Sequence, residues 1–203
     1  MRRNFILFIS TIVVFLLATF GTRADAWGDL GHEIVCEIAF QELKPSAKAE
    51  LKSIIQLDDA FRLFSKSCSW PDHPRIRSRE HFVNLERDEL SFGDEPCPLA
   101  SKCVVSATLN DMRDLGLFED EQEKLRLVKS LGHWVGDLHQ PMHVSFADDK
   151  GANSIDVDSP CDTNLHSVWD TCIIVETLGQ DGRAIADSLR AEISPDDRSK
   201  WFD

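Results

Sequence analysis

Two short segments of the chain each carry a histidine and an aspartate that are separated by one helical turn. His133 and Asp137 lie in HWVGD, and His166 and Asp170 lie in HSVWD. Residues at positions i and i+4 project from the same face of an α-helix. Each pair can therefore offer an imidazole and a carboxylate to one point, and both groups are ligands of transition metals. The repeated spacing predicts a metal-binding layout carried by helices.

A single pair of this kind is more often a solvated surface pair or a structural histidine, so the neighbouring residues decide the interpretation. Asp72 and His81 lie in irregular segments, where ligands are easily aimed. His143 follows Pro141, at which a helix must kink or end, so its imidazole can turn toward a neighbouring site. Together with His32 near the expected mature N-terminus, these residues favour a metal cluster over scattered surface pairs.

The N-terminal segment MRRNFILFISTIVVFLLATFGTRADA has the pattern of a secretory signal peptide. Arg2 and Arg3 precede the apolar run 5–20, and ADA is a cleavage signal. The alternative, an uncleaved membrane anchor, requires about 20 apolar residues, and the run is shorter. Cleavage after Ala26 makes Trp27 the mature N-terminus. We therefore expect a secreted or periplasmic protein without a membrane anchor.

The net charge of −13 argues against a general polyanion-binding surface. A phosphate substrate must then meet a local positive charge, which a metal cluster can supply. The chain has six cysteines, and an even number in an exported protein suggests disulfides. Cys97 and Cys103 flank the short loop CPLASKC and form the pair that we predict. The sequence does not fix the other pairs.

Hydrophobic periodicity and breaker residues predict a mostly helical domain over residues 27–203, after a signal peptide over residues 1–26. Strand signals are scarce: 80–85 reads as a short extended or irregular piece, and 149–157 reads as a turn followed by a short strand. SWPDHPRIR is a Pro-broken loop. The predicted helices cover 30–43, 45–57, 104–116, 119–143, 164–178 and 181–192.

Six motifs, in chain order, resemble those of the zinc-dependent single-strand-specific nucleases of fungi, plants and bacteria, the S1/P1 type. They are WGDLGH, SWPDHPR, HFVN, LGHWVGDLHQPMH, GAN and NLHSVWD, and they run from Trp27 to Asp170. The superfamily also contains the bacterial zinc phospholipases C. The resemblance implies an all-α, single-domain phospholipase C/P1-nuclease-like fold with a trinuclear zinc cleft.

The same resemblance implies three Zn²⁺ ions and their ligands. In this family the mature N-terminal tryptophan binds zinc through its α-amino nitrogen and backbone carbonyl, so cleavage of the signal would create a ligand at Trp27. Asp137 is implied to bridge two ions and so to take part in catalysis. His73 and His139 remain outside the set, and His139 is predicted to face away from the zinc side. The implied ligands are Asp72, His81, His133 and Asp137 for one ion, Trp27, His32 and Asp137 for the second, and His143, His166 and Asp170 for the third.

Three further residues match positions that contact the substrate or the attacking water in the family. Arg75 matches an arginine near the scissile phosphate, where a guanidinium can bind two phosphate oxygens. Asn84 stands where fungal members usually have Asp; an amide can orient water but cannot accept its proton. Asn153 matches an asparagine that contacts the nucleobase. Ala152 replaces a usual glycine, which predicts a narrower base pocket.

The resemblance implies an exported zinc-dependent endonuclease that converts single-stranded DNA and RNA to 5′-phosphorylated products, together with 3′-nucleotidase activity. Its partners are these nucleic acids and nucleotides, and we expect a monomer without a stable protein partner. One alternative is a zinc-dependent phospholipase C, although that branch usually has Glu where this chain has Asp170. Another alternative is a non-catalytic zinc-binding protein or inactive fragment. Family members usually continue through a further long helix, so the resemblance implies that this domain is C-terminally truncated.

Overall fold

The structure is a computed structural model that describes residues 27–203 except positions 90, 159, 162 and 203. The predicted signal peptide and its cleavage site therefore lie outside the described residues, apart from Trp27 itself. Among the described residues, no helix has the length and apolar character needed to cross a membrane.

The described chain is mostly helical, which confirms the predicted fold class. The strands are short: β1 (Val83–Leu85) pairs in parallel with β2 (Val144–Phe146), and β3 (Asp156–Val157) pairs antiparallel with β4 (Thr163–Asn164). Two 3₁₀ turns, η1 (Ser78–Glu80) and η2 (Pro141–His143), and one π-helical turn, η3 (Val168–Cys172), complete the elements. The α-helices are α1 (Asp29–Glu42), α2 (Pro45–Ile55), α3 (Phe64–Ser67), α4 (Val104–Leu115), α5 (Glu121–Leu138), α6 (Leu165–Ser167), α7 (Ile173–Leu178), α8 (Gly182–Glu192) and α9 (Pro195–Phe202).

Local chemistry sets the ends of the long helix α5. Asp120 caps its N-terminus by accepting a hydrogen bond from Glu123 N at 2.9 Å, and acidic residues in the first turn suit the helix dipole. The helix ends at Leu138, shortly before Pro141, which cannot donate a backbone hydrogen bond. The chain then enters the 3₁₀ turn that contains His143. The predicted break at the proline therefore separates Asp137 from His143.

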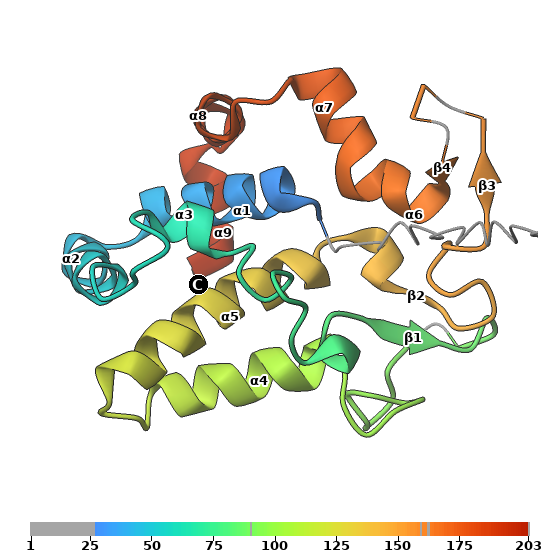
Figure 1. Ribbon diagram of the computed structural model, residues 1–203, viewed down its shortest axis with the longest axis horizontal. Helices are drawn as coiled ribbons and strands as arrows, with labels where there is room; N and C mark the ends of the chain where they lie inside the picture. Colours follow the sequence, from blue (N-terminus) through green and yellow to red (C-terminus); the bar gives the residue numbers. More distant parts are fainter. Residues whose placement is uncertain (1–26, 90, 159, 162, 203) are drawn as a thin grey trace, which may run out of the picture.

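The helices form two layers that enclose the centre of the molecule (Figure 1). Helices α4 and α5 lie side by side in one layer, and α1, α3 and α8 pack together in the other. The N-terminal end of α1 and the C-terminal half of α5 meet near α6 and the β1–β2 pair (Figure 1). This junction brings together segments from most of the chain length.

Separate apolar clusters fix these contacts. Trp134 of α5 is fully buried against Val83, Val104 and Ala107, which joins α5 to α4 and β1. Its indole Nε1 donates to Asp111 Oδ2 at 2.8 Å, which satisfies the buried N–H. A second cluster joins α1 to α7 and α8 through Ile34, Ile174, Ile185 and Ala186.

The cysteines form three disulfides. Cys97 pairs with Cys103, which confirms the one pairing that the sequence predicts. Cys36 of α1 pairs with Cys68, directly after α3, and Cys161 pairs with Cys172. Disulfides are typical of proteins that mature in an oxidising compartment.

Other differences from the sequence-based expectation concern short elements. The region expected as one helix over 164–178 consists of α6, η3 and α7. The sequence does not predict α3, α9, β2 or β4. The π-helical turn η3 contains Asp170, and turns of this kind occur frequently at functional sites.

Candidate metal centre

The junction between the layers contains three groups of histidine and aspartate side chains. In each group the candidate ligand atoms all lie within 4.8 Å of one another, and every member is buried. The side chains come from different elements: His32 from α1, His133 and Asp137 from α5, and His166 from α6. The groups are His32, His133 and Asp137; Asp72, His81 and His133; and His143, His166 and Asp170.

Backbone carbonyls fix the orientation of four of these imidazoles. His133 Nδ1 lies 2.7 Å from Cys68 O, and His81 Nε2 lies 2.8 Å from Ile76 O. His143 Nδ1 lies 2.5 Å from His81 O, and His166 Nδ1 lies 2.6 Å from Gly151 O. A carbonyl can only accept, so each of these ring nitrogens carries the proton. The opposite nitrogen of each ring is then an acceptor, as in histidines that bind metals.

These acceptor nitrogens face one another in pairs. His133 Nε2 lies 3.0 Å from His81 Nδ1, and His143 Nε2 lies 3.1 Å from His166 Nε2. Two acceptors cannot form a hydrogen bond with each other. Two nitrogens bound to one tetrahedral zinc ion lie roughly 3.3 Å apart, given Zn–N distances of about 2.0–2.1 Å. The donor set and its spacing therefore fit a cation of this size between each pair.

The Asp137 carboxylate lies at the centre of the clusters. Its Oδ2 is 3.3 Å from His133 Nε2 and 3.4 Å from His81 Nδ1, whereas its Oδ1 is 3.4 Å from His32 Nε2. Its two oxygens are thus directed to different histidines. Within the described part of the chain, neither oxygen has a hydrogen-bond partner, although Asp137 is fully buried. Burial raises the pKa of Asp137 to about 7, because desolvation penalises the charged form.

The surroundings of His32 disfavour its charged form. Neither nitrogen of the buried His32 ring has a hydrogen-bond partner among the described residues, and the ring stacks on His133 at 3.8 Å between centroids. Burial and then the nearby imidazoles hold the pKa of His32 well below its usual range. Burial also lowers the pKa of His81, His143 and His166. Neutral imidazoles beside buried carboxylates are the state that binds a metal.

Tight packing places Trp27 and His32 against α5. A Cβ added to Gly136 would lie 2.7 Å from His32 Nδ1 and 3.8 Å from Trp27 Cδ1. Gly28, which follows Trp27 in the chain, donates its N–H to Asp170 O at 2.8 Å. The expected mature N-terminus therefore lies beside the histidine and aspartate clusters. The two remaining histidines lie elsewhere: His73 Nε2 contacts Asp29 Oδ1 at 2.7 Å, and His139 is exposed.

A cleft of about 550 Å³ opens beside the third group, with His143 and His166 in its lining. The residues that the sequence assigns to substrate and water, Arg75, Asn84 and Asn153, all line it. Asn84 belongs to β1, whereas Asn153 lies in the turn in which Ala152 has a φ of 64°. The structure thus brings the predicted polar residues to one hollow next to the buried ligand groups.

Comparison with known proteins identifies the family. The family model described as S1/P1 nuclease matches residues 27–203. The chain belongs to the S1/P1 nuclease family. Endonuclease 2 of Arabidopsis thaliana is 32% identical over 213 residues, which cover 95% of this chain and 71% of that relative. Nuclease S1 of Aspergillus oryzae is 31% identical over 164 residues, or 75% of this chain and 56% of the relative.

Nuclease P1 of Penicillium citrinum is 32% identical over 177 residues, which cover 80% of this chain and 63% of that protein. The chain thus spans between 56% and 71% of the length of these three S1/P1 relatives. The family predicted from the sequence motifs is confirmed.

Several residues of this S1/P1 site were not singled out in the sequence. Gln140 is fully buried, donates to Asp170 Oδ1 and accepts from Met142 N, so it connects η2 to η3. Its place between two histidines in HQPMH is the only signal that marks it. Arg79 and Lys150 line the cleft with Arg75, but neither lies in a motif that separates it from other surface cations.

Proposed function

We propose that the chain is a zinc-dependent endonuclease that hydrolyses phosphodiester bonds of single-stranded DNA and RNA to 5′-phosphorylated products, with 3′-nucleotidase activity as a further reaction. One observation carries this proposal: buried imidazole and carboxylate groups meet beside a cleft lined by three cations, Arg75, Arg79 and Lys150. Membership of a family whose members are named nucleases supports it.

We assign three zinc ions to the three groups. Asp72, His81, His133 and Asp137 would hold the first ion, and Asp137 would hold the second together with His32. The α-amino nitrogen and carbonyl of Trp27 complete the second site once the signal peptide over residues 1–26 is removed. The third ion takes His143, His166 and Asp170. The mature domain over residues 27–203 is accordingly proposed to be exported, which agrees with its disulfides.

When bound, zinc supplies Lewis acidity that makes a water nucleophilic near neutral pH and stabilises charge on phosphate oxygens. The protein supplies the remaining functions. Arg75 binds non-bridging phosphate oxygens and stabilises the charge that develops on them. Asn84 orients the attacking water without taking its proton, because a neutral amide is not a base at this pH.

The shape of the cleft suits a single strand. Asn153 offers both a donor and an acceptor to the edge of a base. A base reaches such a hollow only if it is unstacked from its neighbours, which costs much more in a duplex than in a single strand. Preference for single strands therefore follows from the position of the buried groups behind the cleft.

The test uses the chain secreted with its own signal peptide, so that Trp27 is the first residue. Zinc content is measured together with hydrolysis of single-stranded DNA, single-stranded RNA, duplex DNA and phosphatidylcholine vesicles. We expect three zinc ions per chain and hydrolysis of both single strands well above that of the duplex. Release of phosphocholine with intact DNA would identify a phospholipase, and bound zinc without any hydrolysis would identify a non-catalytic protein.

A further inference from the structure

A second hollow adjoins the cleft on the side of the loop closed by Cys97 and Cys103. We call it the loop groove, and it is lined by Arg79, Phe82, Asn84, Leu99, Ala100 and Lys102 among others. Its volume is about 200 Å³, and a shallower hollow of about 340 Å³ continues along Arg79, Leu99 and Lys102. Arg79, Phe82 and Asn84 also line the cleft, so the two hollows share a wall.

The charge along this path differs from that of the whole protein. The chain has 35 acidic and 22 basic residues. Among the described residues that line the cleft and the loop groove there is no Asp or Glu, whereas Arg75, Arg79, Lys102 and Lys150 are present. A continuous cationic path on an acidic protein is a local feature that selects an anionic ligand.

The cations of the loop groove are available to a ligand. Lys102 is 70% exposed, and its Nζ lies 3.8 Å from Glu80 Oε1. That carboxylate is already bound by Arg77. Because Lys102 is mostly solvated and the two charges are 3.8 Å apart, the pair contributes little and is easily exchanged. Arg79 is exposed, and no described carboxylate lies within ion-pair distance of it.

Apolar side chains share the lining of the loop groove with the two cations. Leu99 is 44% exposed, and the half-buried Phe82 forms part of the same hollow. The Cys97–Cys103 disulfide links the ends of the loop that carries Leu99 and Lys102. Single-stranded nucleic acids bind in grooves that combine Lys or Arg for the phosphates with side chains, most often aromatic ones, on which the bases stack.

We propose that the loop groove binds the nucleotide that follows the one in the cleft, with Lys102 on its phosphate and Leu99 under its base. The inference rests on the proposed nuclease function and extends the substrate site from one nucleotide to a strand. Lys102 acts in substrate positioning and not in catalysis. Its contribution therefore depends on substrate length.

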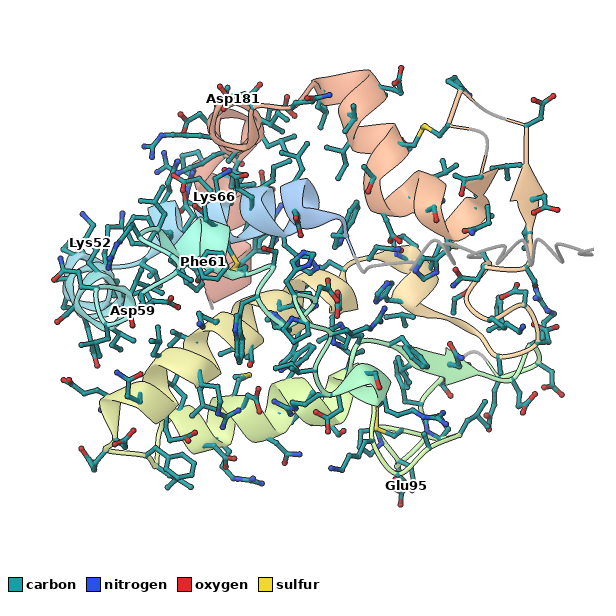
Figure 2. All side chains as sticks on the ribbon, in the orientation of Figure 1. Lys52, Asp59, Phe61, Lys66, Glu95 and Asp181 are labelled. Carbon is teal, nitrogen blue, oxygen red and sulfur yellow. A yellow bond between two sulfur atoms is a disulfide. The ribbon has the colours of Figure 1, made fainter. Side chains whose placement is uncertain are left out.

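The test compares Lys102→Glu with Lys52→Glu in the zinc-loaded protein. Lys52 is also exposed and carries the same charge, but it lies on α2, at the far end of the molecule from the loop that contains Glu95 (Figure 2). Binding is measured by fluorescence anisotropy with phosphorothioate oligothymidylates, which keep the backbone charge and resist hydrolysis. KM and kcat are measured with thymidine 3′-monophosphate, which can fill the cleft but not the loop groove, and with an unmodified thymidine decamer.

For Lys102→Glu we expect the Kd and KM of the ten-nucleotide strand to rise about tenfold, with kcat and the constants of the mononucleotide unchanged. In Lys102→Ala, the slope of log Kd against log salt concentration should fall by about 0.7, because one phosphate contact is lost. Lys52→Glu should resemble the wild type. Equal effects of the two charge reversals, or an equal loss with mononucleotide and decamer, contradict the proposal that the loop groove binds the strand.

Failure of the groove can be separated from failure of the proposed function. If the enzyme is active and its Lys102→Glu variant binds the decamer normally, the loop groove does not bind the strand, and the proposed nuclease function is unaffected. Decamer binding that depends on Lys102 in a protein without hydrolytic activity disproves the nuclease function and supports the groove as a strand-binding site.

Discussion

His133 Nε2 lies 3.0 Å from His81 Nδ1, although each ring directs its other nitrogen to a backbone carbonyl. Two acceptor nitrogens held this close repel each other unless a cation lies between them. The carbonyls of Cys68 and Ile76 thus prepare the two rings for one ion. His143 and His166 repeat the arrangement at 3.1 Å.

The first prediction concerns Asp137, whose two oxygens face different histidines. Asp137→Ala should bind fewer than three zinc ions and lower kcat on single-stranded DNA by at least about 100-fold, because two proposed sites lose a shared ligand. The measurements are metal analysis by mass spectrometry and initial rates. His139→Ala, at an exposed position two residues further on, is the control. If Asp137→Ala kept its zinc and its rate, the proposed bridging role would be wrong.

The second prediction concerns the close contact between Gly136 and His32. In Gly136→Ala the new Cβ would lie 2.7 Å from His32 Nδ1, too close without movement of the ring. We expect loss of one zinc ion and most of the activity, even though alanine favours helices over glycine. In Gly116→Ala the new Cβ would lie at an ordinary distance of 3.4 Å from Arg113 O, so metal content should be unchanged. Equal zinc content in both variants would exclude a role for this packing.

The sequence signals for the histidine and aspartate groups are local. His133 and Asp137, and likewise His166 and Asp170, are one helical turn apart, and the structure places each pair in a separate buried group. The proline in HQPMH likewise predicts the end of α5. Periodicity and breaker residues act over a few positions, which is the range that sequence patterns describe.

Long-range contacts are not visible in the same way. The pairing of His81 with His133 spans 52 positions, and only the fold shows which backbone carbonyls hold the two rings. Helix α9 gives little periodic signal because it is polar, and it is held by the contact of Arg198 with Glu42. The cationic path from the cleft to Lys102 is likewise assembled from separate segments.

The third prediction follows from the ion pairs that join three helices. Glu42 of α1 accepts hydrogen bonds from Arg198 of α9 and Arg190 of α8. These contacts, with Arg198 the stronger, lower the pKa of Glu42 to about 2. The unfolded carboxyl has a pKa near 4.5. Stability from this group is therefore complete above about pH 4.5 and is lost as the pH falls toward 2.

Glu42→Gln should lower the free energy of unfolding by about 1 kcal/mol near pH 6, since the pairs are partly exposed. Chemical denaturation at several pH values measures the difference. The difference in the free energy of unfolding between wild type and variant should shrink below pH 4.5 and nearly vanish at pH 2. A gap that stays constant over this range would show that Glu42 acts by packing and not by charge.

The fourth prediction compares two disulfides that close loops of different length. Cys36–Cys68 joins residues 32 positions apart, whereas Cys97–Cys103 spans only 6. A cross-link restricts the unfolded chain more when its loop is longer. Removal of the first bridge, as Cys36→Ala/Cys68→Ala, should therefore cost about 4 kcal/mol of unfolding free energy, against about 2 kcal/mol for Cys97→Ala/Cys103→Ala.

The two bridges should also differ in their effect on the site. Cys68 O accepts the N–H of His133 Nδ1, and Gly132 of α5 packs against both sulfurs of the Cys36–Cys68 bridge. Loss of that bridge frees the carbonyl that orients a proposed zinc ligand, so zinc affinity should fall with stability. Loss of Cys97–Cys103 should leave zinc affinity unchanged and loosen the loop that carries Lys102. Urea denaturation and zinc titration on both double variants measure the two effects, and an equal change in zinc affinity would refute the link from Cys68 to His133.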